Sequence, residues 1–230
     1  AFAATVNLAT LDGSNGTALY GPRDSLTGAT VASAGDVNGD NLDDILIRAP
    51  GAQQAYVVFG RSEAAPGGIP SSFDLRTLDG STGFTIDADT SSISSAGDVN
   101  GDGLDDFLVG ARFVTVDGDR NAGETYLIFG RDTSVDGPFA TTLDPTQLDG
   151  SDGFIFKGGF AGESVGSSVS SAGDVNDDGI DDLLIGAVGN LSTRTQEGGA
   201  YVVYGGPAAL SYLDAADGLS DGSIELSLIY

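Results

Sequence analysis

The chain of 230 residues carries 34 acidic and 9 basic residues, which give a formal net charge of −25. Nucleic acids and anionic membranes bind clustered Lys and Arg, so this charge excludes both as partners, and no apolar run approaches the about 20 residues that span a bilayer. Cys and His are absent, which excludes disulfides, soft-metal sites, Ser-His-Asp triads and cysteine nucleophiles.

Short strands joined by tight turns are the elements that the composition favours. Hydrophobic residues make up 40% of the chain, enough for a packed core, and the 36 Gly residues are about twice the usual share. Gly and Asp mark turns, and the short runs between them are β-branched or aromatic. An all-β fold is therefore expected.

The chain is a single repeat region in which one long unit occurs three times, at residues 1–60, 70–130 and 141–205, followed by a terminal strand segment at 206–230. In chain order, each unit has a Leu-Asp-Gly-Ser-x-Gly turn, a Ser-Ala-Gly-Asp-Val-Asn segment, an apolar run and an aromatic run that ends in Gly. These lie at 11–16, 33–38, 45–47 and 56–60, then at 78–83, 95–100, 107–109 and 126–130, and then at 148–153, 171–176, 183–185 and 201–205.

Each unit has the pattern of four short strands, which at this period predicts a β-propeller blade. Val57, Phe59 and Tyr204 lie in near-continuous apolar stretches, which predicts strands covered on both faces by neighbouring sheets. A degraded copy of the Leu-Asp-Gly-Ser turn at 217–222 adds a surplus strand. Closed propellers need about four blades or more.

The predicted fold class is therefore all-β, with three four-stranded blade-like units plus one extra strand. We expect these blades to be part of a larger propeller, completed by the remainder of a longer chain or by self-association as a homo-oligomer. The alternative is a compact arrangement capped by a C-terminal strand at 223–230.

An Asp-rich loop follows the Ser-Ala-Gly segment in every unit and predicts a calcium site. Oxygen-bearing residues stand at loop positions 1, 3, 5 and 9, and such spacing in a tight loop turns them toward one centre, where Ca²⁺ takes about six to eight oxygens. A backbone carbonyl at position 7 would add another. The predicted ligands of the three sites are Asp36, Asn38, Asp40, Leu42 and Asp44; Asp98, Asn100, Asp102, Leu104 and Asp106; and Asp174, Asn176, Asp178, Ile180 and Asp182.

Position 6 of this loop must turn sharply, which Gly103 and Gly179 do freely and Asn41 does better than other residues. An EF-hand is excluded because position 12, which would need a Glu, is apolar in all three units. Mg²⁺ suits the loop less well because it prefers a small octahedron. The competing interpretation is that Asp, Asn and Gly only form turns, but three loops in one frame favour calcium.

The acids at position 8, Asp43, Asp105 and Asp181, stand next to predicted ligands and could be mistaken for catalytic pairs. Successive strand residues point to opposite faces, so adjacent acids cannot readily flank one glycosidic bond. We expect the position-8 acids to be solvated, or to support the metal ligands without touching the metal. No residue set predicts an enzyme.

The loop sequence Gly-Asp-Val-Asn-Gly-Asp-Gly-Leu-Asp-Asp at 97–106, followed by a strand and Gly-Ala, resembles the FG-GAP repeat of integrin α-subunit propellers and their bacterial relatives. The Phe-Gly dipeptide is replaced by Thr27-Gly28, Asp89-Thr90 and Val165-Gly166, and Arg48 stands where the family has Gly. The resemblance implies a seven-bladed propeller with calcium between the first two strands of a blade. It also implies extracellular adhesion or ligand recognition.

Three functions remain open from the sequence. The first is an extracellular module for adhesion or recognition of a protein or glycan ligand, with structural calcium; the others are an accessory domain of a larger secreted enzyme or surface protein, and a calcium-dependent lectin. The opening Ala-Phe-Ala-Ala resembles the end of a cleaved signal peptide, or else the edge of an excised piece. Phe84, Phe154, Phe156 and Phe160 could form a recognition surface, but packing between blades is the favoured interpretation.

Overall fold

The computed structural model describes residues 7–63, 69–189 and 198–228. Two of its sheets have five strands. Their orders, with bounds, are β10 (Thr142–Leu143), β6 (Gly83–Asp87), β4 (Gln54–Val58), β3 (Asp44–Ala49) and β2 (Thr30–Gly35) in one, and β15 (Ser223–Glu225), β11 (Gly153–Lys157), β9 (Glu124–Ile128), β8 (Asp106–Ala111) and β7 (Ser92–Gly97) in the other.

The other two sheets are smaller. One has three antiparallel strands in the order β12 (Val165–Gly173), β13 (Asp182–Ala187) and β14 (Gly199–Val203), and the other pairs β1 (Ala18–Tyr20) with β5 (Ser72–Asp74) in parallel. The helices are short: α1 spans Thr133–Asp136, α2 spans Pro207–Asp214, and 3-10 turns lie at Leu8–Thr10, Pro50–Ala52, Leu75–Thr77, Pro145–Gln147, Ala215–Asp217 and Leu226–Leu228. Among the described residues, no helix is long and apolar enough to cross a membrane.

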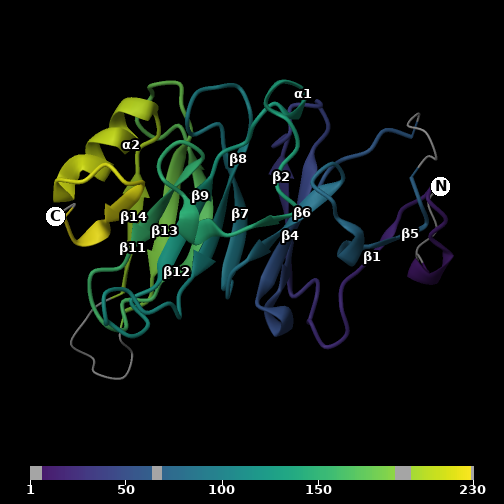
Figure 1. Ribbon diagram of the computed structural model, residues 1–230, viewed down its shortest axis with the longest axis horizontal. Helices are drawn as coiled ribbons and strands as arrows, with labels where there is room; N and C mark the ends of the chain where they lie inside the picture. Colours follow the sequence, from purple (N-terminus) through teal and green to yellow (C-terminus); the bar gives the residue numbers. More distant parts are fainter. Residues whose placement is uncertain (1–6, 64–68, 190–197, 229–230) are drawn as a thin grey trace.

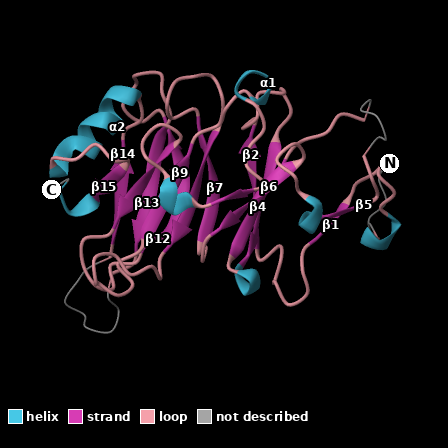
Figure 2. Cartoon of the chain, in the orientation of Figure 1, coloured by secondary structure: helices cyan, strands magenta, loops and turns pink. Residues whose placement is uncertain are grey.

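The predicted blade-like sheets are confirmed, and they stack face to face in a row (Figures 1 and 2). In each five-stranded sheet, four strands are antiparallel neighbours, and a short strand adds in parallel at the outer edge. The fourth strand of the first sheet, β6, comes from residues 83–87, within the second sequence unit. Each five-stranded sheet therefore takes its fourth strand from the next sequence unit.

The core lies between successive sheets. Leu46, Val57 and Phe84 of the first sheet pack against Phe107 and other residues of the second in one buried cluster. A second cluster joins the other face of the second sheet to the third sheet, with Leu108, Leu127 and Phe156 packed against Leu183, Ile185 and Val203. Burial of both sides of a strand fits the near-continuous apolar runs of the sequence.

The aromatic residues follow the favoured interpretation of packing. Phe84 and Phe156 are fully buried, Phe154 is buried and Phe160 is half-buried. The ring of Phe84 stacks on Phe139 with centroids 4.5 Å apart. Most of the phenylalanines that could have formed a recognition surface are thus used inside the stack.

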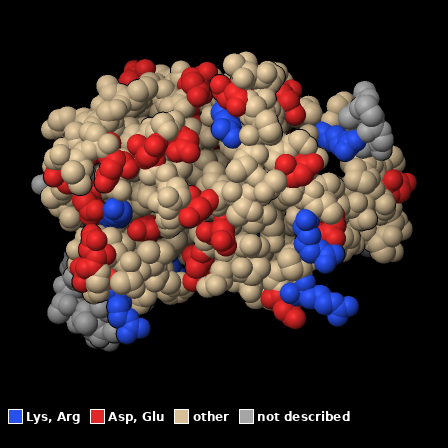
Figure 3. All heavy atoms as spheres, in the orientation of Figure 1, with Lys and Arg blue, Asp and Glu red and all other residues tan. Residues whose placement is uncertain are grey.

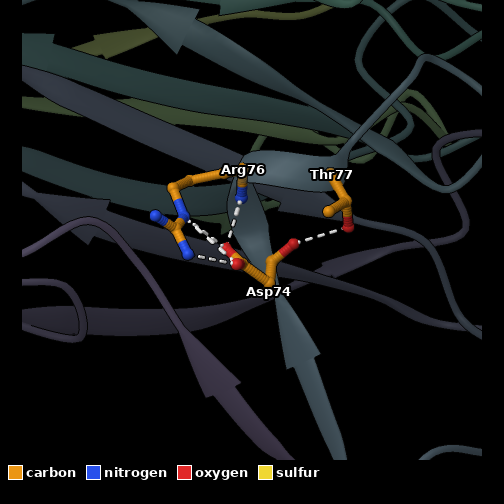
Figure 4. Close-up of polar contacts among 3 residues, drawn as sticks. All are labelled: Asp74, Arg76 and Thr77. Carbon is orange, nitrogen blue, oxygen red and sulfur yellow. Dashed lines mark hydrogen bonds and ion pairs between the residues drawn. The ribbon is translucent and has the colours of Figure 1, made fainter.

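Asp and Asn also have purely structural uses in the turns of the outer strands. Asp74 caps the 3-10 turn that follows β5, because its carboxylate accepts from the Arg76 amide at 3.0 Å and from the Arg76 guanidinium (Figure 4). Asp79 and Asp149 in the Leu-Asp-Gly-Ser turns each accept from the amide two residues on, at 3.0 Å. The turn-forming interpretation therefore holds for these acids.

Two expectations for the C-terminal part were wrong. Tyr204, which follows β14, is 52% exposed, because no described sheet covers the face of the third sheet that points away from the second. The segment 206–230, expected to be a strand segment, begins with helix α2, and its strand covers Ser223–Glu225 rather than 223–230. Pro207 at the first helical position and the following Ala-Ala-Leu favour the helix; residues 229–230 lie outside the described part.

Candidate metal-binding loops

The three Asp-rich loops occupy equivalent places in three sheets. Each connects the first strand of a sheet to the second: β2 to β3 for residues 36–44, β7 to β8 for 98–106, and β12 to β13 for 174–182. The loop thus joins two strands, which excludes the helix-flanked EF-hand.

The position-1 carboxylate organises the loop from inside. Asp36 accepts hydrogen bonds from the amides of Gly39, Asp40 and Asn41 at 2.8, 3.1 and 2.7 Å. Asp98 makes the same three bonds, at 2.8, 3.1 and 2.9 Å, and Asp174 accepts from the amides at positions 5 and 6. The backbone of each loop is therefore folded around one acidic side chain, even before any cation is considered.

The expected sharp turn at position 6 is present in all three loops. Asn41, Gly103 and Gly179 have left-handed φ values of 63°, 90° and 87°. Position 4 is left-handed as well, with Asp177 at φ 63° where the other loops have Gly. Asn and Asp tolerate this conformation better than other non-Gly residues, so the loop geometry survives these substitutions.

The position-9 carboxylate of each loop accepts hydrogen bonds from two backbone amides. Asp44 is buried and accepts from the Val37 amide at 3.1 Å and from the Gly60 amide at 2.7 Å. Asp106 and Asp182 make the equivalent pairs of bonds. Burial, together with the nearby charges of Asp40 and Asp36, raises the pKa of Asp44 to about 7, although the two amide bonds lower it.

Burial likewise raises the pKa of Asp106 to about 7, with Asp102 and Asp98 adding to the effect. The like charges that act on Asp44 and Asp106 come from positions 1 and 5 of their own loops. A cation among these three acids would favour the ionised form of the buried one.

Positions 3 and 5 carry the remaining side-chain oxygens. The position-5 carboxylates of Asp40, Asp102 and Asp178 each accept from the position-7 amide at 2.9 Å. Asn100 and Asn176 donate to the position-5 carboxylate at 2.9 Å, whereas the buried Asn38 lies 3.3 Å from both oxygens of Asp44.

The donor set fits a hard cation in its chemistry. It consists of carboxylate and amide oxygens, which Ca²⁺ prefers, and an ionised carboxylate that accepts one amide keeps further lone pairs. Within the part of the chain that the structure describes, no three acidic side chains converge closely enough to hold a metal as they stand. Holding calcium would therefore require the position-5 and position-9 side chains to share or reorient their present hydrogen bonds.

The position-8 acids have a use that the sequence reasoning missed. The Asp105 carboxylate accepts from the Asp36 amide of the preceding loop at 2.9 Å, and the Asp105 amide donates back to the Asp36 carbonyl at 3.1 Å. Asp181 makes the same pair of bonds to Asp98, at 3.1 and 3.3 Å. Of the two alternatives expected for position 8, Asp105 and Asp181 therefore follow the second, support of a predicted ligand, whereas the exposed Asp43 follows the first.

The glycine before each position-1 Asp makes this loop-to-loop contact possible. A Cβ on Gly35 would lie 2.2 Å from the Asp105 carboxylate, and one on Gly97 would lie 2.0 Å from the Asp181 carboxylate. The repeated Gly-Asp pair was the available sequence signal. Its partner could not be found without knowing that successive loops lie side by side.

Two cavities adjoin the first two loops. One, of about 480 Å³, is lined by Asn38, Asp40, Phe59 and Arg61 among others. The other, of about 900 Å³, is lined at equivalent places by Asn100, Asp102, Phe129 and Arg131. Acidic side chains are scattered over the face of the molecule seen in Figure 3, and basic ones are few.

Comparison with known proteins finds FG-GAP repeats in two parts of the chain. The FG-GAP repeat model matches residues 27–59 and 90–128, which contain the first two loops. Phosphatidylinositol-glycan-specific phospholipase D of Dictyostelium discoideum is 25% identical over 93% of this chain and 24% of its own length. Integrin alpha-PS2 of Drosophila melanogaster is 28% identical over 80% of this chain and 12% of its own length. The chain thus spans about a quarter or less of these relatives.

Proposed function

We propose, on the premise that the chain is an FG-GAP repeat protein of the integrin α type, that it is a recognition module stabilised by calcium and working outside the cell. Calcium at the three loops would be structural, and the chain would have no catalytic role of its own. The observation that carries the proposal is the threefold recurrence of one loop, with the same oxygen donors at positions 1, 3, 5 and 9, between the first two strands of three sheets.

Electrostatics supports a cation at these loops. The net charge of −25 and the clustering of three acids in each loop oppose folding through repulsion. Calcium supplies positive charge and oxygen coordination there. Bound cations would also cross-link the fold, as disulfides do in many extracellular modules, since this chain has no Cys.

The recognition role rests on the cavities beside the first two loops. Asn38 and Asp40 line one cavity and Asn100 and Asp102 the other, so the loops form part of their walls. Ordering these loops would fix the shape of the walls. A protein or glycan ligand that enters them would then bind in a calcium-dependent way without touching the metal.

The test is thermal unfolding of the chain after EGTA treatment, with calcium or magnesium added back. Calcium is expected to raise the Tm more than magnesium does, because Mg²⁺ suits the loop less well. An ion that binds only the native state stabilises it by about 2.7 kcal/mol when its free concentration is 100 times its Kd. An unchanged Tm, together with no heat of binding in calorimetry, would reject the calcium sites.

A matched pair of variants separates the loops from general charge. Asp102→Asn keeps the shape of an exposed position-5 ligand and removes its charge, whereas Asp149→Asn makes the same change in a Leu-Asp-Gly-Ser turn, outside the loop sequence. The first is expected to weaken calcium binding and leave the calcium-free Tm unchanged. Equal calcium affinity for the two variants would contradict the assignment.

A second candidate is an accessory, non-catalytic part of a larger secreted enzyme or surface protein. The match that covers 93% of this chain within 24% of a phospholipase D favours it. Sequencing the complete gene and assaying the encoded protein, with and without residues 1–230, decides between the two. An encoded catalytic region whose activity survives the deletion supports the accessory role.

A further inference from the structure

Three departures from the repeat pattern lie close together between the first and second sheets. Arg48 and Thr90 each stand at a position where the other two units have Gly, and Arg112 stands where they have Pro or Val. The Nε of Arg48 donates to the Thr90 carbonyl at 2.7 Å. The Arg112 amide donates to the hydroxyl of the next residue, Ser91, at 3.1 Å. Two arginines from neighbouring sheets therefore flank the segment 90–91.

The equivalent place between the second and third sheets is filled by two glycines in close contact. A Cβ on Gly110 would lie 2.1 Å from the Gly166 carbonyl oxygen, and one on Gly166 would lie 2.9 Å from the Ala111 amide nitrogen. Arg48 takes the place of Gly110 in the first sheet and bonds to the carbonyl that corresponds to that of Gly166. Glycine can thus make this contact between sheets, so packing alone does not require an arginine there.

The side chains around this contact have hydrogen-bonding groups that the described part of the chain does not use. Neither Arg48 nor Arg112 forms an ion pair with a carboxylate there. The Nε of Arg112 and the hydroxyl of Thr90 are both buried, and neither has a hydrogen-bond partner among the described residues. Buried polar atoms without a partner are rare in native proteins, and a bound ion or water is one physical reason for them.

The charges around Arg48 favour the addition of one negative charge. Burial lowers the pKa of Arg48, the charge of the exposed Asp89 raises this pKa, and the charge of Arg112 lowers it. The two guanidinium groups are therefore near enough to repel each other, and an anion between them would be attracted to both. Two arginines and one aspartate leave a single positive charge. A monoanion matches this better than a polyanion, which the net charge of −25 would also repel.

An aromatic ring supports the Arg112 guanidinium on one face. The Cζ of Arg112 lies 4.3 Å from the ring centroid of Phe113, which is 52% exposed. A ring stacked on its face leaves the edge of a guanidinium, with its N–H donors, available for hydrogen bonds. This planar fork matches the two oxygens of a carboxylate, which can accept two parallel hydrogen bonds from it. A carboxylate is therefore the monoanion that the pair of arginines fits.

We propose that Arg48 and Arg112 form a binding site for a single carboxylate, carried by a free organic acid or by a Glu side chain of a protein. Arg112 donates to both carboxylate oxygens, and an Nη group of Arg48 donates to one of them. The site lies away from the Asp-rich loops, because Arg48 follows Asp44 by four residues on β3, about 13 Å at about 3.3 Å per residue. Carboxylate binding is therefore independent of calcium at the loops, and this inference does not rest on the calcium sites.

The first test is an NMR titration of the ¹⁵N-labelled chain, observed at the arginine Nε–H signals and at constant ionic strength. The probes are acetate, the peptide acetyl-Gly-Glu-Gly-amide and its neutral counterpart acetyl-Gly-Gln-Gly-amide. The signals of Arg48 and Arg112 are expected to shift until saturation with acetate or the Glu peptide, and not with the Gln peptide. No saturable shift with either carboxylate, or an equal shift with the Gln peptide, would overturn the proposal.

The two carboxylate probes also distinguish the two sources of the ligand. Tighter binding of the Glu peptide than of acetate supports a protein side chain as the ligand, whereas equal or tighter binding of acetate supports a free organic acid.

Matched variants separate the site from general charge. Arg112→Gln removes the charge and the planar fork, Arg112→Lys removes only the fork, and Arg76→Gln removes the same charge from a guanidinium that already pairs with Asp74. Arg112→Gln is expected to raise the Kd of the carboxylate at least about tenfold, Arg112→Lys to raise it less, and Arg76→Gln to leave it unchanged. Equal Kd values for Arg112→Gln and Arg76→Gln would contradict the site.

Arg48 is tested by giving the first unit the residue of the other two. Arg48→Gly removes the guanidinium at a position where glycine already joins two sheets, and it is expected to weaken carboxylate binding in a chain that still unfolds cooperatively. If this variant does not fold, Arg48→Lys keeps the charge and most of the side chain, and a smaller loss of affinity is expected from it. A folded variant that binds the carboxylate as tightly as the unmodified chain would reject the role of Arg48.

Repeating the titration with EGTA and with added calcium separates the two proposals. The same Kd is expected in both conditions, even if calcium changes the Tm. A carboxylate affinity that appears only with calcium would place the ligand at the Asp-rich loops and overturn the assignment to the arginines.

Discussion

The Asp105 carboxylate accepts a hydrogen bond from the Asp36 amide at 2.9 Å, and so joins the second loop to the first across two sheets. The return bond from the Asp105 amide to the Asp36 carbonyl measures 3.1 Å. This reciprocal pair recurs between Asp181 and Asp98. The three candidate metal loops therefore form one connected row, in which the position-8 Asp of one loop hydrogen-bonds to the backbone of the position-1 Asp of the preceding loop.

Removing this carboxylate should weaken the contact between the sheets. Asp105→Ala is expected to lower the free energy of unfolding by about 1–3 kcal/mol, because the half-buried Asp36 amide loses a charged acceptor. Chemical denaturation measured without calcium checks this value. Asp87→Ala, the same change at an exposed residue of β6, is the control and should have little effect; an equal loss in both variants would contradict the role given to Asp105.

The aromatic contact between the first two sheets should contribute more. Phe84→Ala removes a fully buried ring that stacks on Phe139, and a loss of about 3–5 kcal/mol is expected from the lost burial and the cavity left behind. Phe113→Ala, at a half-exposed ring, provides the comparison. Similar unfolding midpoints for the two variants would show that the core does not lie where these sheets meet.

Much of the fold could be predicted because each signal is local and repeated. The turn residues of the Leu-Asp-Gly-Ser segments, the short apolar runs and the nine-residue Asp loops each recur in one frame. The left-handed turn at Asn41, Gly103 and Gly179 follows from position alone. Local chemistry decided these features, so the sequence was sufficient for them.

Features that depend on which sheet lies beside which could not be predicted in this way. The bond between Asp105 and Asp36 joins residues far apart in sequence and exists only because their sheets stack. Tyr204 resembles Phe59 and Phe129 in sequence, and it is exposed only because no described sheet follows the third one. Helix α2 also has no counterpart of equal length among the described residues of the other units, so the repeat pattern could not indicate it.

Arg76 is expected to set the acidity of Asp74. The hydrogen bond from the Arg76 side chain, followed by the bond from its amide, lowers the pKa of Asp74 to about 2. In Arg76→Ala the amide bond remains and the pKa should rise part of the way toward its ordinary value of 3.8. NMR titration measures this shift, and Asp79, whose pKa of about 2 comes from Ser81 and Thr82, should not move.

The sign of the resulting pH dependence follows from the lowered pKa. A carboxyl with a lower pKa in the folded state stabilises the fold above its unfolded pKa, and this contribution is lost as the pH falls toward about 2. In Arg76→Ala the stability difference from the unmodified chain should therefore be present at neutral pH and shrink in strong acid. A difference that grows on acidification would contradict the assignment.

Gly97 and Gly103 offer a sharp test of the contact between loops, because both have left-handed φ values, 77° and 90°, in the same loop region. Alanine at either position bears the strain of that conformation, about 1–2 kcal/mol. Only at Gly97 would the new Cβ meet the Asp181 carboxylate, at 2.0 Å; at Gly103 nothing lies within 4 Å. Gly97→Ala should therefore destabilise the chain more than Gly103→Ala in denaturation, and this excess should largely disappear when Asp181→Ala is added. If the extra destabilisation by Gly97→Ala persists in the double variant, the Asp181 carboxylate is not its cause, and Gly97 has no part in the contact between the loops.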